Sequence, residues 1–198
     1  MKTKIVKFEK GVDEAVRVLK NGEVIACATD TVYGLSSDPF NKSAVKKIYD
    51  LKNRERNIPL LLVAHKDYDV SSLVYLDRRA EKYIEKYWPG SVTFVFRIKD
   101  ERLKELSCGK DTIAIRKPID YTFNLLLEKC QILTSTSANI SKQPVSTSAS
   151  DVVKYFGEKI SLVLDNGESK NVSSTIIDLT GDKIEILRQG EVKIDNNL

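Results

Sequence analysis

Hydroxyl side chains gather on one short stretch of the chain, TSTSANISKQP at residues 134–144, which also carries Asn139. The preceding residues, 131–133, have the apolar character of a short strand that leads directly into this stretch. Ser, Thr and Asn favour turns, so a surface loop is one interpretation. A hydroxyl cluster at the end of a buried strand is also where an open α/β sheet commonly binds a ligand. The stretch alone leaves both interpretations open.

Positively charged side chains stand just past other predicted elements. Lys52 and Arg54 lie at the end of the second predicted helix, and Arg116 and Arg188 each follow an apolar strand. A planar guanidinium at a strand end suits a carboxylate or phosphate ligand. The alternatives are a solvated helix end for Arg56, a buried ion pair for Arg116 and an exposed edge-strand position for Arg188.

Small neutral donors accompany these cations. Thr31 lies in the segment 29–35, which we expect to be a turn permitted by Gly34, and Ser174 precedes a late strand. Together with Ser137 and Asn139, such groups would suit a polyanion beside a small polar molecule. The chain has no GxxxxGK[ST] loop, so side chains would have to hold a nucleotide. Spacing alone therefore predicts an ATP-sized anion site.

Composition limits the chemistry available to this chain. Its 198 residues, 41% hydrophobic and 30% charged, suit a globular protein, and we expect one domain over residues 1–198. The net charge of +4 would suit an anionic ligand. The single histidine, His65, excludes a multi-histidine metal site. Three widely spaced cysteines without metal-ligand spacing predict free thiols and a cytoplasmic location. No apolar run is long enough for a membrane span or signal peptide, so no membrane partner is expected.

Strand-like and helix-like segments alternate along the chain and predict an α/β protein with a mixed sheet and flanking helices. The expected strands are 5–8, 23–29, 59–64, 91–98, 112–115, 131–133, 161–164, 175–179 and 183–187. The strand at 91–98 alternates as if one face were exposed, and the last two strands are expected to pair around 180–182. Helices are expected around 12–19, after the caps Asn41 and Asp77, from Asp120 to Cys130, and at 148–156.

Several ordered blocks carry a family resemblance. They are ATDTVYGL, LKNRERNIPL, YWPGSVTFVF, TIAIRKP, TSANISKQP, SSTIIDLT and ILRQG. In this order they resemble the YrdC-type threonylcarbamoyl-AMP synthase family, in its single-domain form, over nearly the whole chain. The resemblance implies a twisted open sheet with a concave basic cavity. It also implies that L-threonine, bicarbonate and ATP, with Mg²⁺, give threonylcarbamoyl-AMP and pyrophosphate. Partner proteins would then transfer the threonylcarbamoyl group to tRNA.

The resemblance assigns roles to individual residues. The residues implied around threonine are Thr31, Arg116, Ser137 and Ser174. Those implied around ATP are Lys52, Arg54, Thr112, Asn139, Thr147 and Arg188. Lys52 would lie near the phosphates and would act with Arg54 as the catalytic pair. A threonine carbamate would attack the α-phosphate, so the reaction needs no nucleophile from the protein. Catalysis would depend on the positioning of the substrates and on positive charge.

The sequence departs from the family pattern at a few places. Glu55 replaces a usual proline, Ile58 a common Asn or Lys, and Lys142 a common glycine. Val63 stands where some members have a histidine that faces threonine, and His65 two residues later is expected to be structural.

Two other function classes fit parts of the pattern. A concave basic surface with tyrosines could bind tRNA or double-stranded RNA without catalysis. A carbamoyl-adenylate enzyme of related fold would act on carbamoyl phosphate, but the chain lacks zinc-finger-like cysteines. Dependence on threonine distinguishes the synthase from both.

Overall fold

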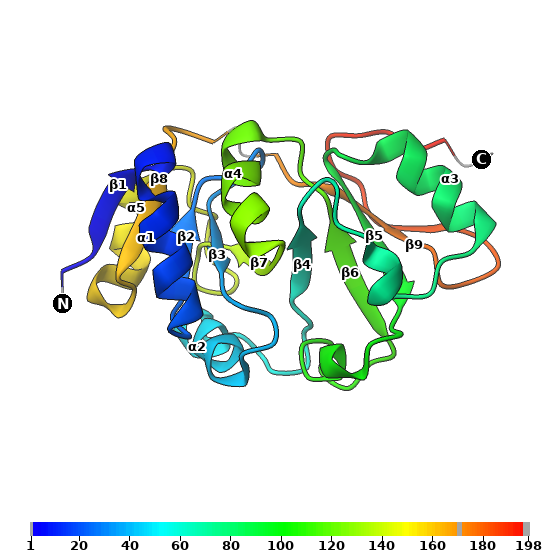
Figure 1. The fold of residues 1–198 in the computed structure, drawn as a ribbon, viewed down its shortest axis with the longest axis horizontal. Helices are drawn as coiled ribbons and strands as arrows, with labels where there is room; N and C mark the ends of the chain where they lie inside the picture. The colour runs from blue at the N-terminus through cyan, green and yellow to red at the C-terminus, as the bar shows by residue number, and fades with distance from the viewer. Residues whose placement is uncertain (1, 170–171, 196–198) are drawn as a thin grey trace.

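A computed structural model describes residues 2–169 and 172–195 and contains one mixed sheet flanked by helices (Figure 1). The strands are β1 (Lys4–Lys7), β2 (Ile25–Cys27), β3 (Gly34–Ser36), β4 (Leu61–Ala64), β5 (Val92–Arg97), β6 (Thr112–Arg116), β7 (Ile132–Ser137), β8 (Leu162–Asp165), β9 (Thr175–Asp178) and β10 (Glu185–Arg188). The α-helices are α1 (Phe8–Lys20), α2 (Lys42–Lys52), α3 (Arg78–Tyr87), α4 (Tyr121–Cys130) and α5 (Ala149–Phe156). Short 3₁₀ turns are η1 (Val70–Ser72), η2 (Glu101–Lys104) and η3 (Gly157–Lys159).

The sheet has the strand order β1-β8-β2-β3-β7-β4-β6-β5-β9-β10. Pairs such as β4 with β6 and β5 with β9 are parallel, while β4 with β7 and β5 with β6 are antiparallel. The predicted α/β class with a mixed sheet is therefore confirmed. So is the predicted pairing of the last two strands, because β9 and β10 run antiparallel to each other.

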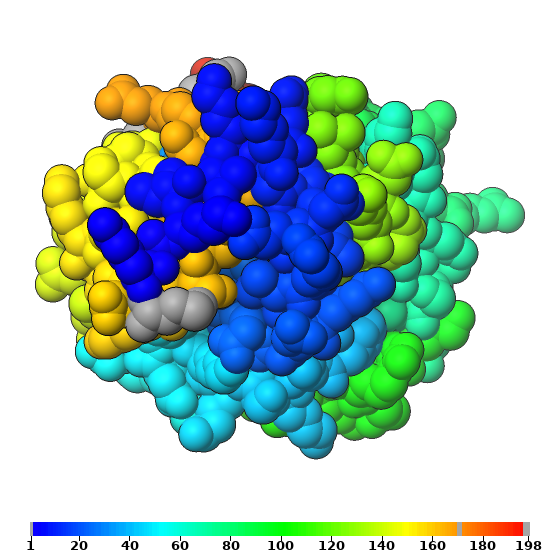
Figure 2. All heavy atoms as spheres, turned by 60° about the vertical axis from the view of Figure 1, so that its left-hand side comes forward, coloured from blue at the N-terminus to red at the C-terminus, as the bar shows by residue number. Residues whose placement is uncertain are grey.

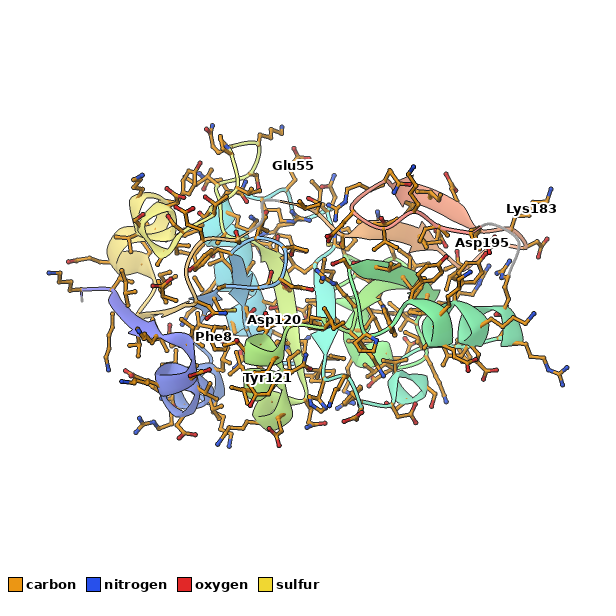
Figure 3. The ribbon with its side chains drawn as sticks, turned by 90° about the horizontal axis from the view of Figure 1, so that it is seen from above. Phe8, Glu55, Asp120, Tyr121, Lys183 and Asp195 are labelled. Carbon is orange, nitrogen blue, oxygen red and sulfur yellow. The ribbon has the colours of Figure 1, made fainter. Side chains whose placement is uncertain are left out.

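The helices lie on both faces of the sheet. Figure 3 shows α1, α4 and α3 on one side of the sheet and α5 on the other. Figure 2 shows the end of the molecule where the N-terminal segment lies beside the segment that follows α5, in agreement with the parallel pairing of β1 and β8. No helix within 2–169 or 172–195 is both long and apolar enough to cross a bilayer.

Four of the helices begin at a residue whose side chain caps the helix. Asn41, Asp77, Asp120 and Ser148 each accept a hydrogen bond from a backbone N–H three residues later. Each cap satisfies a donor that the helix cannot satisfy itself and stabilises the protein by about 0.5–2 kcal/mol. The caps therefore fix where these four helices begin.

Three details differ from the sequence-based expectation. Phe8 is the first residue of α1 and not the last of a strand, and it is buried against Phe123 of α4. The segment expected to be only a turn contains β3, which pairs with β2 and β7. The expected exposed face of β5 is wrong, because Val92 to Phe96 are all buried.

One face of β5 is covered by the nearby Trp88 and the other by a distant part of the chain. Phe94 and Phe96 pack on Trp88, with ring centroids 5.1 Å and 5.9 Å from the indole. On the other face, the Thr93 hydroxyl hydrogen-bonds the Ser174 hydroxyl at 2.9 Å. A tertiary contact thus removes from solvent a face that the alternation pattern assigns to water.

The first four residues of the hydroxyl stretch, 134–137, belong to a strand and not to a loop. β7 extends through Ser137, with Ser135 opposite Leu61 of β4 and Ser137 opposite Gly34 of β3. Thr134 is fully buried and accepts a hydrogen bond from the backbone N–H of Ser37 at 2.9 Å. The surface-loop interpretation is therefore wrong for 134–137, and the hydroxyls are held at fixed positions in the middle of the sheet.

Candidate functional site

A cavity of about 350 Å³ lies beside the centre of the sheet and gathers residues that are far apart in the sequence. It is lined by residues from the β2–β3 connection, the end of the segment after α2, β6, β7 and the segment that leads into β9. Predicted site residues in the lining are Thr31, Arg54, Arg116, Ser137, Ser174 and Arg188. The structure thus brings six of the ten predicted residues to one cavity.

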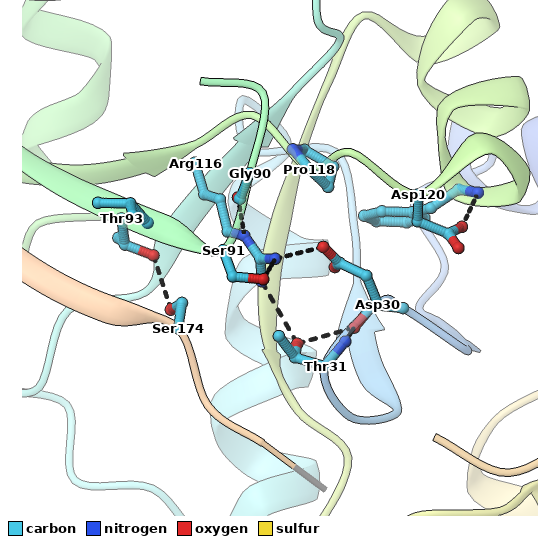
Figure 4. A network of polar contacts seen from close by, with 12 residues as sticks. Asp30, Thr31, Gly90, Ser91, Thr93, Arg116, Pro118, Asp120 and Ser174 are labelled. Carbon is cyan, nitrogen blue, oxygen red and sulfur yellow. Dashed lines mark hydrogen bonds and ion pairs between the residues drawn. The ribbon is translucent and has the colours of Figure 1, made fainter. Parts of the chain in front are cut away.

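Arg116 ends β6 and is 6% exposed at the wall of the cavity. Its Nε donates to the carbonyl oxygen of Gly90 at 2.9 Å, and its Nη1 donates to the hydroxyl of Thr31 at 3.3 Å. Its Nη2 donates to the Asp30 carboxylate and to the Ser91 hydroxyl (Figure 4). The buried ion pair that the sequence left open is therefore present, and most of the guanidinium fork is already occupied.

Asp30 also lines the cavity, although no pattern in the sequence singles it out. Its carboxylate is 12% exposed, lines the cavity and pairs with Arg116. Burial raises the pKa of Asp30, and the positive charge of Arg116 acts in the opposite direction. In the sequence, Asp30 stands directly before Thr31 in ATDTVYGL, where an aspartate usually indicates a turn.

Ser174 and Arg188 form a second polar group on the cavity wall. The Ser174 hydroxyl lies 2.9 Å from the Thr93 hydroxyl, and Arg188 Nη2 donates to the Ser174 hydroxyl at 3.1 Å. Arg188 also donates to the Ser174 carbonyl oxygen, at 3.0 Å from Nε and 2.9 Å from Nη2. These hydrogen bonds fix the positions of Ser174 and Arg188 relative to each other, although the two residues lie on different segments.

The segment that contains Ser174 is held closely by the turn after β10. The Gly190 N–H donates to the Thr175 hydroxyl at 3.0 Å. A Cβ atom at Gly190 would lie 2.5 Å from the Thr175 nitrogen and even closer to main-chain atoms of Ser173 and Ser174. Only glycine allows this approach of two backbones beside the cavity wall.

Arg54 lies at the cavity just after α2. Its guanidinium donates to the carbonyl oxygens of Ile58 at 3.2 Å and Pro59 at 2.9 Å. These bonds fix the side chain but leave other N–H groups for a ligand. Burial lowers the pKa of Arg54 from its usual value.

Lys52 is a buried cation, and its expected role near the phosphates stays a prediction. It is 1% exposed, lies outside the cavity lining and donates from Nζ to the carbonyl oxygens of Ser137 and Asn139. It also donates to the Asn139 side-chain oxygen at 3.2 Å. Burial, and secondly the nearby Arg54, lower the pKa of Lys52 to about 7.

Three other predicted ATP residues also lie outside the cavity lining. Thr112 is at the beginning of β6, opposite Arg97. Asn139 lies with Lys52, and its side-chain NH₂ donates to the carbonyl oxygens of Ile140 and Gln143. The Thr147 hydroxyl lies 3.3 Å from the Asp151 carboxylate at the start of α5. The role of each in binding ATP stays a prediction.

The residues that depart from the family pattern lie partly at the surface and partly at the cavity. Glu55 and Lys142 pair with each other at 3.6 Å, with side chains 60% and 86% exposed, so the pair contributes little stability. Ile58 is exposed, whereas Val63 lines the cavity. His65 lies outside the lining, and its Nδ1 accepts the Asp67 N–H at 3.4 Å, consistent with the expected structural histidine.

The comparisons with known proteins agree with this architecture. The Sua5/YciO/YrdC family model, which carries the description telomere recombination, matches residues 17–190. The chain belongs to the Sua5/YciO/YrdC family. Its fold is shared with a solved member, the Pyrococcus abyssi Sua5 complexed with L-threonine, at a TM-score of 0.90 and 32% identity. The match covers 95% of this chain and 58% of that chain.

Relatives of similar length cover nearly the whole chain. A protein of Methanocaldococcus jannaschii is 34% identical over 98% of this chain and 96% of its own length. The threonylcarbamoyl-AMP synthase of Klebsiella pneumoniae is 33% identical over 91% of this chain and 96% of its own length. The family expected from the sequence is therefore confirmed.

Proposed function

We propose that this protein is an L-threonylcarbamoyladenylate synthase, a nucleotidyltransferase that uses L-threonine, bicarbonate and ATP and releases pyrophosphate. The observation that carries the proposal is the convergence of Arg54, Arg116 and Arg188 with Thr31, Ser137 and Ser174 on one cavity. Cations suit the phosphates and the amino-acid carboxylate, while hydroxyls suit the threonine side chain. Relatives that bear this activity in their names, and a related structure that holds L-threonine, support it.

The proposed reaction requires that the protein position its substrates, and it needs no nucleophile from the protein. The threonine amine takes up carbon dioxide derived from bicarbonate to give a carbamate, and a carbamate oxygen attacks the α-phosphate of ATP. The bond to the β-phosphate breaks, and pyrophosphate leaves. Arg54, which lines the cavity with unused N–H groups, would stabilise the charge that develops on the phosphates.

Mg²⁺ would arrive on ATP and not on a protein cage. The described residues contain no group of three or more His, Cys, Asp or Glu side chains that could hold a metal ion. Mg²⁺ is commonly bound through substrate phosphates and water with few protein ligands, so this donor set fits a metal that enters with its nucleotide. The ion would neutralise charge on the phosphates of the leaving pyrophosphate.

The product would pass to other proteins that modify tRNA. Threonylcarbamoyl-AMP is an activated mixed anhydride, so a transferase that carries the threonylcarbamoyl group to an adenosine of tRNA would consume it. We place these steps in the cytoplasm, because Cys27, Cys108 and Cys130 are all free thiols, as is usual in a reducing compartment.

The test is pyrophosphate release by the purified protein with ATP and Mg²⁺, with threonine or bicarbonate omitted in turn. We expect release only when both are present, together with threonylcarbamoyl-AMP detected by mass spectrometry. Removal of Mg²⁺ with a chelator should also stop the release of pyrophosphate. Folded protein that binds ATP but releases no pyrophosphate under any of these conditions would contradict the proposal and favour an RNA-binding module.

A further inference from the structure

The cavity carries several cations but very little negative charge. Among the described residues that line it, Arg54, Arg116 and Arg188 are basic, and Asp30 is the one acidic residue. An α-amino acid carries an ammonium group as well as a carboxylate. A cavity of this composition would repel the ammonium group everywhere except near Asp30.

The two oxygens of the Asp30 carboxylate have different partners. Oδ2 accepts a hydrogen bond from Arg116 Nη2 (Figure 4). Oδ1 is buried and has no hydrogen-bond partner. Buried polar atoms without a partner are uncommon because their desolvation is not compensated, so an orphaned carboxylate oxygen at a cavity wall points to a missing donor.

Arg116 does not supply that missing donor. Its Nε is used by Gly90, its Nη1 contacts Thr31, and its Nη2 is shared between the Asp30 Oδ2 and Ser91. The remaining charged neighbours oppose the carboxylate, since Asp120 and Glu191 are both negative. A positively charged donor from the ligand would therefore satisfy Oδ1 and offset this repulsion.

We infer that Asp30 is the amine-binding residue of the cavity, and that its unpartnered Oδ1 accepts a hydrogen bond from the ammonium group of the substrate amino acid. The inference rests on the proposed function, because it names the part of threonine that Asp30 recognises. Rotation about the soft terminal torsion of an aspartate can turn this enclosed oxygen toward the cavity. Asp30 then contacts both the ligand and Arg116, so it links recognition of the amine to placement of the guanidinium.

The experiment compares L-threonine with (R)-3-hydroxybutanoate, which keeps the carboxylate and hydroxyl of threonine but has no amine. Affinities are measured by calorimetry for the wild-type protein, Asp30→Asn and Glu191→Gln. Glu191 is exposed and outside the lining, so Glu191→Gln is a control that removes a neighbouring negative charge. We expect Asp30→Asn to weaken threonine binding at least about tenfold and analogue binding less than about threefold, with little change for Glu191→Gln.

Equal losses for both ligands in Asp30→Asn would show that Asp30 only supports Arg116, and would overturn the inference while the proposed function stands. No loss for either ligand would overturn it as well. Failure of the wild-type protein to bind threonine at all would instead overturn the proposed function, and the inference with it.

A measurement on the wild-type protein avoids any loss of folding in the variant. With ¹³C-labelled aspartate, the signal of the Asp30 carboxyl carbon should move when threonine is added and stay in place when the analogue is added. Identical spectra with the two ligands would contradict contact between Asp30 and the amine.

Discussion

The ammonium nitrogen of Lys52 lies 2.8 Å from the carbonyl oxygen of Asn139, beneath the wall of the cavity. The backbone of the same residue also holds this region, because the Ser141 N–H donates to the Lys52 carbonyl oxygen at 2.8 Å. Ser137, whose hydroxyl donates to the Asn139 side chain at 2.5 Å, is part of the same unit. In this structure Lys52 therefore organises the segment that follows β7.

The Lys52→Met variant should loosen this segment. Methionine keeps much of the side-chain volume but leaves the acceptors of Ser137 and Asn139 without their donor, which costs about 1–3 kcal/mol for a buried group. We expect hydrogen exchange of the Ser141 amide to be at least about ten times faster. Lys47→Met is the matched control, since Lys47 lies on the same helix and pairs with Glu23 at the surface. Unchanged exchange would contradict this structural role, and lost turnover with unchanged exchange would support the expected contact of Lys52 with phosphate.

The protonation of Lys52 should also affect stability. Because its pKa is about 7 in the folded protein and near 10.5 ordinarily, the folded state binds fewer protons than the unfolded state between these values. The free energy of unfolding should therefore rise with pH across this window. Urea unfolding of the wild-type protein and Lys52→Met should show the wild type gaining about 2 kcal/mol relative to the variant from pH 7 to pH 9. A difference that does not depend on pH would contradict the shifted pKa.

Arg54→Ala should lower turnover at least about a hundredfold without loss of the fold. Loss of one preorganised donor to a developing charge commonly costs about 2.7–4 kcal/mol of barrier. Arg56→Ala is the control, because Arg56 lies two residues later but pairs with Asp50 at the surface. Pyrophosphate release measures both variants. Near-normal turnover in Arg54→Ala, or an equal loss of turnover in Arg56→Ala, would contradict a catalytic role for Arg54.

The cavity should reject valine in favour of threonine. Valine lacks the hydroxyl that Thr31 and Ser174 would bond, so buried polar groups would be left unpaired. We expect kcat/KM for valine to be lower at least about a hundredfold, with serine closer to threonine. Pyrophosphate release with each amino acid provides the comparison, and equal turnover with valine would show that the hydroxyls do not read the side chain.

Local rules account for the parts of this molecule that depend on neighbours in the sequence. The caps Asn41, Asp77 and Asp120 lie where the pattern places them, since a cap needs only its own helix. β3 is not predictable in this way, because three residues in a segment that contains Gly34 give no measurable alternation. The covered second face of β5 is not predictable either, because Ser174 reaches Thr93 from 81 residues away.

The candidate site shows the same division. The pattern predicts Arg116 at the end of a strand, where the structure has it, but only the folded chain reveals that Asp30 occupies part of its guanidinium. Similarly, the spacing of Lys52 and Arg54 gives no information on which of the two faces the cavity. That choice depends on the carbonyl oxygens of Ser137 and Asn139, which lie 85 and 87 residues further along.

Gly190 sets a limit on how this protein can be engineered. A side chain there would collide with the main chain at 173–175, which no change of rotamer can relieve. A saturation library at this position should therefore yield glycine alone among clones that retain a folded cavity wall. At Gly181 the nearest atom to an added Cβ would be 3.6 Å away, so the same library should accept alanine. Labels attached through a new side chain accordingly belong at Gly181 and not at Gly190.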